Sequence, residues 1–212
     1  MEPIESANLP PEVPVKKTTK EKLFDMAVEL FSERGTESVS IRDLTRAVGI
    51  KESSFYNHFK SKDALIMAIF EALRQAYAQT MPPDERIEFN LTQMTALAFL
   101  ERGNALFIER MATASNKKIW RILFVEQYRD PRARELIRQE LIQRPLLFTE
   151  KVFQKLIDMG QVKPMDAQQL AAEYFYPIAL LCSYSMMDDE NTDVIEQQLK
   201  NHVEFFWNLI KK

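Results

Sequence analysis

A single glycine separates two short helical patterns early in this chain, and such a corner leaves the two helices few ways to pack. Ser40 precedes the first pattern and suits a helix N-cap, while Asp43 in the first turn complements the helix dipole. Gly49 ends the pattern, since glycine adopts a left-handed backbone conformation without steric cost. We therefore predict one helix between Ser40 and Gly49 and a second directly after the corner.

The second helix of this pair has one apolar and one polar face. Phe55 and Phe59 are four residues apart and share a face, and Ile50 is expected to fill the corner between the helices. The opposite face holds small and polar side chains: Glu52, Ser53, Tyr56, Asn57 and Lys60. This pattern is typical of a helix-turn-helix, which places its second helix in the major groove of DNA.

The residue types around the turn predict two kinds of DNA contact. Phosphate contacts, which set the register of a protein on the duplex, are expected from Ser40, Arg42, Tyr56, His58 and Lys62. Base-edge contacts are expected from Lys51, Glu52, Ser53, Ser54 and Asn57. Structural alternatives are a solvated first turn for the two serines, a helix-start preference for Glu52, and packing of His58 against the phenylalanines.

With these motifs the chain resembles the TetR family of bacterial transcriptional repressors. The shared features are Gly49-Ile50, Tyr56-Asn57-His58-Phe59 and Ser61-Lys62-Asp63, and residues 23–35 are similar to the first helix of the family and its glycine stop. Lys51 stands where the family usually has a serine, so the second helix is expected to lack a side-chain cap. The resemblance implies operator DNA as a partner, a homodimer and an inducer pocket.

The charge distribution agrees with a DNA-binding segment near the N-terminus. Residues 16–62 carry ten Lys and Arg against seven Asp and Glu, although the net charge of the whole chain is −3. The remaining residues from 63 on carry eighteen basic against twenty-one acidic side chains. The small basic excess predicts moderate affinity for DNA that weakens steeply with salt.

Several sequence features indicate where the protein is located in the cell and which classes of protein it does not resemble. A single cysteine, Cys182, allows no intrachain disulfide, and no apolar run is long enough to span a bilayer, so a cytoplasmic protein with no membrane partner is expected. The chain has no Walker loop, zinc motif or catalytic triad pattern, and its histidines, His58 and His202, are far apart in sequence. We therefore predict no enzyme activity, no cofactor and no metal site.

The rest of the chain is predicted to be mostly helical. Only four glycines are present, and the expected helix starts include Thr18 with Glu21, Asp130-Pro131, and Asp166 with Gln169. A helix from about residue 90 to 114 is expected to break near Gly103, and a long helix ending at Gly160 is expected to bend at Pro145. The predicted fold class is all-α: a mobile tail (1–17), a three-helix helix-turn-helix domain (18–62) and a larger helical domain (63–212).

The larger domain holds many flexible and aromatic side chains, each of which by itself is more often core. Because the resemblance implies an inducer pocket in this domain, some of them are predicted to bind a small hydrophobic or aromatic effector. The candidates are Met94, Phe107, Met111, Trp120, Phe124, Tyr128, Phe148 and Tyr174. Pro177 lies within a helical pattern and predicts a kink that is either plain or part of the pocket wall.

The last two predicted helices carry broad apolar stripes. The first includes Leu170, Ala171, Tyr174, Phe175, Ile178, Leu181, Cys182 and Ser185, and the second Ile195, Leu199, Val203, Phe206, Leu209 and Ile210. Each stripe is either ordinary core or half of a four-helix interface between two copies. The resemblance implies the interface.

These features together predict a ligand-responsive transcriptional regulator. The resemblance implies a repressor that binds operator DNA as a dimer and is released by its effector. Two other classes remain: a helical interaction module whose head does not bind DNA, and an enzyme. Binding to promoter DNA that depends on salt distinguishes the regulator from the interaction module.

Overall fold

The computed structural model describes residues 17–79, 81–187 and 192–212. The predicted mobile tail lies outside these residues except for Lys17. The described residues form helices and connecting turns, with one isolated antiparallel bridge between Val162 and Lys211. The prediction of an all-α fold is confirmed.

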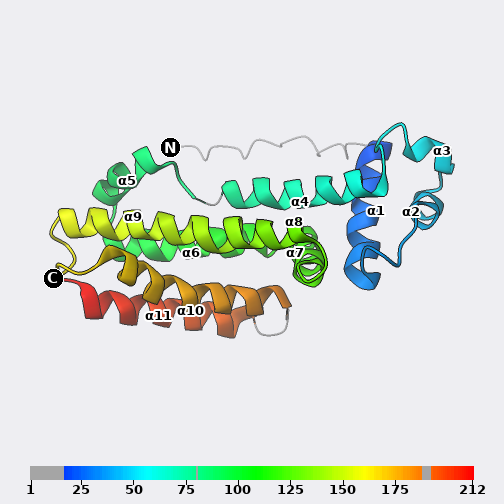
Figure 1. The fold of residues 1–212 in the computed structure, drawn as a ribbon. Coiled ribbons are helices and arrows are strands. Elements are labelled where there is room, and N and C mark those ends of the chain that lie inside the picture. The colour runs from blue at the N-terminus through cyan, green and yellow to red at the C-terminus, as the bar shows by residue number, and fades with distance from the viewer. Residues whose placement is uncertain (1–16, 80, 188–191) are drawn as a thin grey trace, which may run out of the picture.

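Three helices make a small head at one end of the molecule (Figure 1). They are α1 (Thr19–Arg34), α2 (Ile41–Val48) and α3 (Glu52–Phe55). Thr18 and Glu21 form the predicted capping box at the start of α1. The next helix, α4 (Lys62–Ala78), starts after the cap residue Ser61 and runs from the head along the body.

The body consists of the remaining helices, several of which run alongside one another away from the head (Figure 1). A short 3₁₀ turn (Asp84–Arg86) leads into α5 (Ile87–Gln93), and α6 (Ala96–Met111) and α7 (Ala114–Glu126) follow. Helix α8 (Pro131–Leu136) continues through a π-helical segment (Ile137–Gln143) into α9 (Arg144–Asp158). Two long helices, α10 (Ala167–Met187) and α11 (Thr192–Ile210), complete the body.

The prediction of a helix break near Gly103 was wrong, because Gly103 lies inside α6. The break comes earlier, where Met94 is extended (φ −149°, ψ 166°) between α5 and α6. Thr95 then caps α6, its hydroxyl accepting the backbone N–H of Ala98 at 3.2 Å. A threonine that can satisfy a free N–H group sets this boundary, whereas a glycine in mid-helix is merely tolerated.

The distortion expected at Pro145 occurs just before it. The π-helical segment ends at Gln143, and the backbone N–H of the next residue, Arg144, donates to the carbonyl of Gln139, five residues back. Pro145 has no N–H group and occupies the first turn of α9. Before the proline, the backbone hydrogen bonds therefore change from four-residue to five-residue spacing, and the chain continues as a helix.

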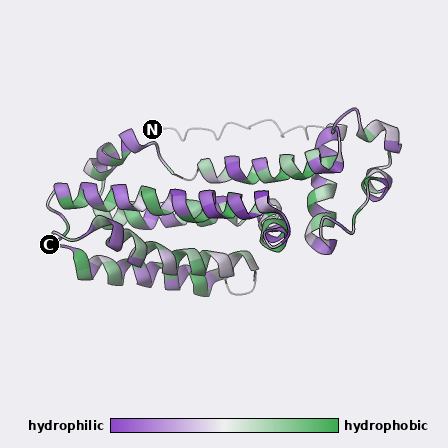
Figure 2. Ribbon diagram, viewed as in Figure 1, coloured by the Kyte–Doolittle hydropathy of each residue, from purple (hydrophilic) through white to green (hydrophobic). Residues whose placement is uncertain are grey.

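Two apolar clusters form the core. The first joins residues of the head to α4, α7 and α8, so the head and the near end of the body share buried side chains. The second lies among α5, α6, α9, α10 and α11. Hydrophobic and hydrophilic residues alternate along the body helices, as expected of helices with one buried side (Figure 2).

The apolar stripes of the last two helices belong mainly to the second cluster. Buried members of the stripes are Leu170, Ala171, Tyr174, Ile178, Cys182, Ile195, Leu199, Val203, Phe206 and Ile210. Of the residues considered for an interface, only Leu209 is exposed. The stripes are thus the inner faces of α10 and α11, and any contact with a second copy falls to the opposite faces.

Candidate DNA-binding head and effector cavity

The turn between α2 and α3 has the predicted local chemistry. The Ser40 hydroxyl accepts the Asp43 backbone N–H at 3.1 Å, and the Asp43 carboxylate accepts the Ser40 backbone N–H at 2.9 Å. Gly49 has φ 77° and ψ 34°, a left-handed conformation that strains other residues. The backbone N–H of Ile50 donates to the Thr45 carbonyl at 2.9 Å, which closes the corner.

Two buried phenylalanines hold the segment after the turn. Phe55 is fully buried and Phe59 nearly so, with ring centroids 5.9 Å apart. Regular helix α3 is only one turn long, but the backbone N–H groups of His58 and Phe59 both donate to the Phe55 carbonyl and extend the turn. Lys51 makes no side-chain cap, as predicted. The polar side of the segment therefore faces outward.

Most of the predicted DNA contacts are on this outward side. Ser40, Arg42, Lys51, Glu52, Ser53, Tyr56 and Asn57 are exposed, and Ser54, His58 and Lys62 are half-buried. The Tyr56 side chain is 57% exposed, and its ring meets Phe55 edge-on with centroids 5.5 Å apart. The Arg42 guanidinium lies 3.9 Å from the Glu52 carboxylate in an exposed ion pair.

The Lys62 ammonium group has a structural role in addition to the predicted one. Its Nζ donates to the backbone carbonyls of Thr36 at 2.9 Å and Val39 at 3.1 Å, in the loop between α1 and α2. An ammonium group has three N–H donors, so one stays available for a phosphate. One basic residue outside the predicted set, Lys20, lies 5.7 Å above the Phe59 ring. The sequence pattern of the motif did not identify Lys20, because this residue lies on a different helix.

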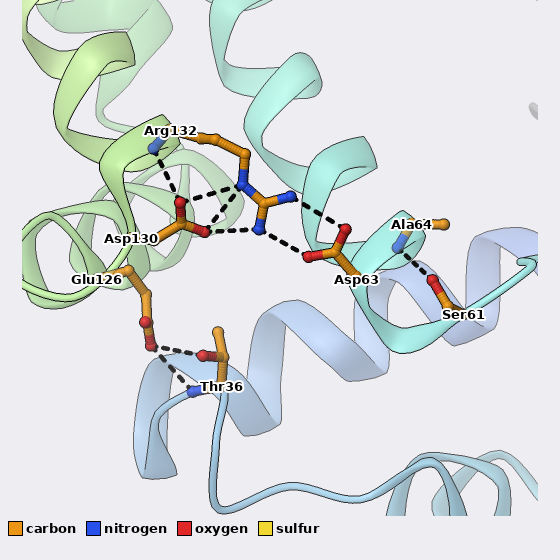
Figure 3. A network of polar contacts seen from close by, with 7 residues as sticks. All are labelled: Thr36, Ser61, Asp63, Ala64, Glu126, Asp130 and Arg132. Atoms are coloured by element: carbon orange, nitrogen blue, oxygen red, sulfur yellow. Dashed lines mark hydrogen bonds and ion pairs between the residues drawn. The ribbon is translucent and has the colours of Figure 1, made fainter.

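A polar junction connects the head to the body (Figure 3). The buried carboxylate of Glu126, at the end of α7, accepts hydrogen bonds from the backbone N–H and the hydroxyl of Thr36. Arg132 in α8 donates to Asp63 at the start of α4 and to Asp130. The hydrogen bonds from Arg132 lower the pKa values of Asp63 and Asp130.

 The pKa of Asp63 is lowered chiefly by its hydrogen bonds from the Arg132 side chain. The Glu126 carboxylate therefore binds the loop between α1 and α2, and the Arg132 guanidinium binds the start of α4.

The body encloses a cavity of about 790 Å³, within the size range of small-molecule sites. It lies between α4, α6, α7, α9 and α10, and its lining is mostly apolar. Six of the eight predicted effector-binding residues line it: Met94, Phe107, Trp120, Phe124, Phe148 and Tyr174. The helical body therefore brings together side chains that are up to eighty residues apart in the sequence.

Two of the predicted effector-binding residues lie elsewhere. Met111 is buried in the first core cluster and is not part of the cavity lining. Tyr128 follows the end of α7 and is 81% exposed, so it does not reach the cavity either. Both were chosen by residue type, and residue type does not reveal on which side of a helix or beyond which helix end a side chain falls.

Aromatic rings form one wall of the cavity. Trp120 stacks against Phe124 with ring centroids 4.7 Å apart and an interplanar angle of 25°. Tyr77 of α4 lies nearly parallel to Trp120, with centroids 5.9 Å apart and an angle of 15°. Helices α4 and α7, which both contact the head, therefore meet at this wall.

A few polar groups interrupt the apolar lining. Asn104 donates to the Tyr174 hydroxyl at 3.1 Å, and burial raises the pKa of this tyrosine. Burial also raises the pKa of the Cys182 thiol to about 12. The indole N–H of Trp120 is buried and has no acceptor among the described residues. Sequence patterns missed Asn104, because a single polar residue on an apolar helix face carries no periodic signal. Cys182 was identified only as a member of an apolar stripe and not as a cavity residue.

The outer faces of α10 and α11 carry large exposed apolar side chains. They are Tyr176, Leu180 and Tyr184 on α10, and Val194, Phe205 and Leu209 on α11. Tyr176 and Leu180 also line the cavity. A group of exposed apolar side chains on two neighbouring helices is typical of a protein interface.

The described part of the chain holds neither a cluster of metal ligands nor a membrane-spanning helix. No cluster of three or more potential metal ligands occurs among those residues. No described helix is both long and apolar enough to cross a membrane. The head and the cavity are the two features whose geometry indicates function.

Comparisons with known proteins find relatives of the head and of longer parts of the chain. Residues 23–69 match the model for bacterial regulatory proteins of the tetR family. The HTH-type transcriptional regulator UidR of Escherichia coli (strain K12) is 29% identical over 156 residues, which cover 69% of this chain and 70% of UidR. The name of this relative describes a regulator of transcription.

Solved structures share the fold over most of the chain. The complex of SmeT, a repressor from Stenotrophomonas maltophilia, with triclosan has a TM-score of 0.68 and 18% identity, and the match covers 92% of each chain. A putative transcriptional regulator from Saccharomonospora viridis in complex with choline has a TM-score of 0.63 and 20% identity, covering 91% of this chain and 97% of the other. At these identities the likeness establishes the fold.

Proposed function

We propose that this chain, a transcriptional regulator that belongs to the TetR family, is a repressor that binds operator DNA as a homodimer and releases it when a small aromatic or hydrophobic compound enters the cavity. The observation that carries the proposal is the outward polar face of the segment after Gly49, held in place by buried Phe55 and Phe59. A helix-turn-helix needs such a face to reach base edges in the major groove.

The DNA contacts divide into two groups by position and chemistry. Arg42, Tyr56 and Lys62 are proposed to contact phosphates, with Lys62 using the donor left after its two carbonyl contacts. Lys51 and Asn57 are proposed to read base edges, since lysine suits guanine and asparagine suits adenine. The phosphate contacts predicted from sequence also include Ser40 and His58. The predicted base-edge contacts also include Glu52, Ser53 and Ser54. Lys20 is added as a phosphate contact, because it lies beside Phe59 in the segment after Gly49, which we call the recognition segment.

The homodimer is proposed to form through the outer faces of α10 and α11. Two helices from each copy then make a four-helix interface that covers exposed side chains such as Leu180 and Phe205. A two-fold dimer presents its recognition segments to half-sites about 34–36 Å apart, or a multiple of that distance. A change in the angle between the heads therefore changes the fit to DNA.

Two helices are proposed to connect the cavity with the heads. Helix α4 contributes Tyr77 to the aromatic wall and begins at the head. Helix α7 contributes Trp120 and Phe124 to the same wall, and its last residue, Glu126, binds Thr36 in the loop before α2. A ligand that favours a different position of these helices shifts the population away from the DNA-binding state. Allosteric couplings of this kind are about 1–3 kcal/mol, which changes affinity roughly 5- to 150-fold.

The test is a gel-shift assay with the DNA upstream of the protein's own gene, at several salt concentrations and with a panel of aromatic compounds. We expect binding that weakens steeply with salt and is released by at least one compound. A variant with Tyr56→Ala and Asn57→Ala serves as a control that folds but does not bind DNA. Absence of salt-dependent binding by the native protein would leave only the interaction-module alternative.

A further inference from the structure

The charged residues of the cavity lining all have the same sign. Among the described residues that line it, the only ionisable side chains with a full charge at neutral pH are Arg86 and Arg102, and no aspartate or glutamate is present. Both arginines are exposed, so they lie where the cavity meets solvent. Neither has an ion-pair partner among the described residues, and their guanidinium groups are therefore available to a ligand.

Among the described residues, the cavity lining has no carboxylate that would stabilise a buried cation. Transfer of a positive charge from water into an apolar cavity is costly unless a carboxylate or an aromatic face compensates for it. The faces of Trp120 are already involved in stacking with Tyr77 and Phe124. The positive charge of Arg86 and Arg102 therefore disfavours a cationic ligand and favours a ligand with a negative charge near them.

The deeper part of the cavity fits a flat apolar ligand body. Trp120 stacks between Tyr77 and Phe124, and Phe107 meets Tyr77 edge-on, so rings of several orientations form the aromatic wall of the cavity. Aromatic ligands pack against such rings edge-to-face or in offset stacks. The unpaired Trp120 N–H on this wall adds one donor for an acceptor atom on the ligand.

We propose that the effector is an aromatic acid, whose ring system packs against the aromatic side chains of the lining and whose carboxylate is bound by Arg86 and Arg102. Arginine binds a carboxylate through two parallel N–H donors, which gives directional preference as well as affinity. This inference rests on the proposed function in one respect, that the cavity is the effector site. It goes further by specifying the sign of the charge and its place at the mouth.

The test uses a series of ligands that differ only in charge: anthracene-9-carboxylate, the corresponding amide and the corresponding aminomethyl cation. Binding to the full-length native protein is measured by calorimetry. We expect the carboxylate to bind about tenfold more tightly than the amide, and the cation to bind most weakly. Equal or tighter binding of the cation, or no binding by any member of the series, would overturn the proposal.

Variants then assign the selectivity to the two arginines. Arg86→Gln and Arg102→Gln together should remove the roughly tenfold advantage of the carboxylate while the amide binds as before. Arg121→Gln, an exposed arginine of α7 outside the cavity lining, is the matched control and should change neither affinity. Unchanged selectivity in the double variant would contradict the assignment.

A DNA-release assay separates this inference from the proposed function. If the series binds in the predicted order but no member releases DNA, the repressor mechanism fails and the ligand assignment stands. If the amide or the cation binds more tightly than the acid and releases DNA, the mechanism stands and the ligand assignment fails. The two claims are therefore tested by different measurements on the same protein.

Discussion

The carboxylate of Glu126 accepts two hydrogen bonds from Thr36, one from the backbone N–H at 3.2 Å and one from the hydroxyl at 2.7 Å. The two residues are 90 positions apart in the sequence, and both are buried. Thr36 lies in the loop before α2, and its own carbonyl accepts a hydrogen bond from Lys62 at the start of α4. A single loop residue thus connects α7 and α4 to the helix-turn-helix.

Loss of the Glu126 carboxylate should destabilise the protein. Glu126→Ala leaves the N–H and hydroxyl of Thr36 buried without an acceptor, which costs about 1–3 kcal/mol in free energy of unfolding. Thr36→Val removes one of the two donors and should cost less. Urea unfolding of both single variants and the double variant measures the coupling, and strict additivity of the two effects would show that the residues do not interact.

The contribution of Arg132 should depend on pH. Its hydrogen bonds lower the pKa values of Asp63 and Asp130, so both aspartates stay ionised to lower pH in the folded than in the unfolded chain. The resulting stabilisation is complete above the ordinary aspartate pKa of about 3.9 and is lost as pH falls through the lowered values. Because the side chains are partly exposed, the effect is about 1 kcal/mol or less.

The measurement for Arg132 compares the native protein with Arg132→Gln in urea unfolding at neutral and at strongly acidic pH. The native protein should be more stable at neutral pH, and the difference should disappear in acid. Arg121→Gln is the control for loss of one positive charge. A difference that is constant across this pH range would rule out the ionised aspartates as its source.

Two neighbouring residues of the recognition segment should affect DNA binding differently. Tyr56→Phe removes the proposed phosphate contact and keeps the ring against Phe55, so affinity should fall alike for all operator sequences. Asn57→Ala removes the proposed base-edge contact and should relax the preference at one base position by about 1–3 kcal/mol. Affinities for a set of single-base operator variants distinguish the two patterns, and a uniform loss for Asn57→Ala would contradict its assignment.

Charges on the outer faces of the last two helices should dissociate the dimer. Tyr184→Glu together with Phe205→Glu places carboxylates on the proposed interface, outside the cavity lining. Sedimentation analysis should then show a monomer, and affinity for a two-half-site operator should fall. Phe89→Glu alters an equally exposed aromatic residue of α5 and should leave the dimer intact. Persistence of the dimer in the double variant would place the interface elsewhere.

The Cys182 thiol should report on the cavity. Its pKa is raised to about 12 by burial, so at pH 8 the thiolate, which is the reactive form, is on the order of one part in ten thousand. We expect very slow reaction with Ellman's reagent in the native protein and fast reaction in urea. Because Cys182 lines the cavity, a bound ligand should slow the reaction further. Fast modification of the folded protein would show that the thiol is accessible.

Local sequence was sufficient for the elements whose causes lie within a few residues. The Ser40 cap, the left-handed Gly49 and the buried pair Phe55 and Phe59 were all predicted, because caps, turns and i,i+4 faces depend on near neighbours. The same reasoning erred at Gly103, where the cap residue Thr95 set the boundary. Residue type, together with the pocket that the family resemblance implies, suggested six of the cavity residues but not their arrangement.

The sequence by itself therefore determined the helical class, the corner of the head and the polar face of its recognition segment. Only the tertiary structure decided that Glu126 binds Thr36, that Arg86 and Arg102 share a cavity, and which faces of α10 and α11 remain exposed. An apolar stripe predicts that a helix side is covered, but it does not identify what covers it. Contacts between residues far apart in the chain depend on how whole helices pack, and no local pattern records that packing.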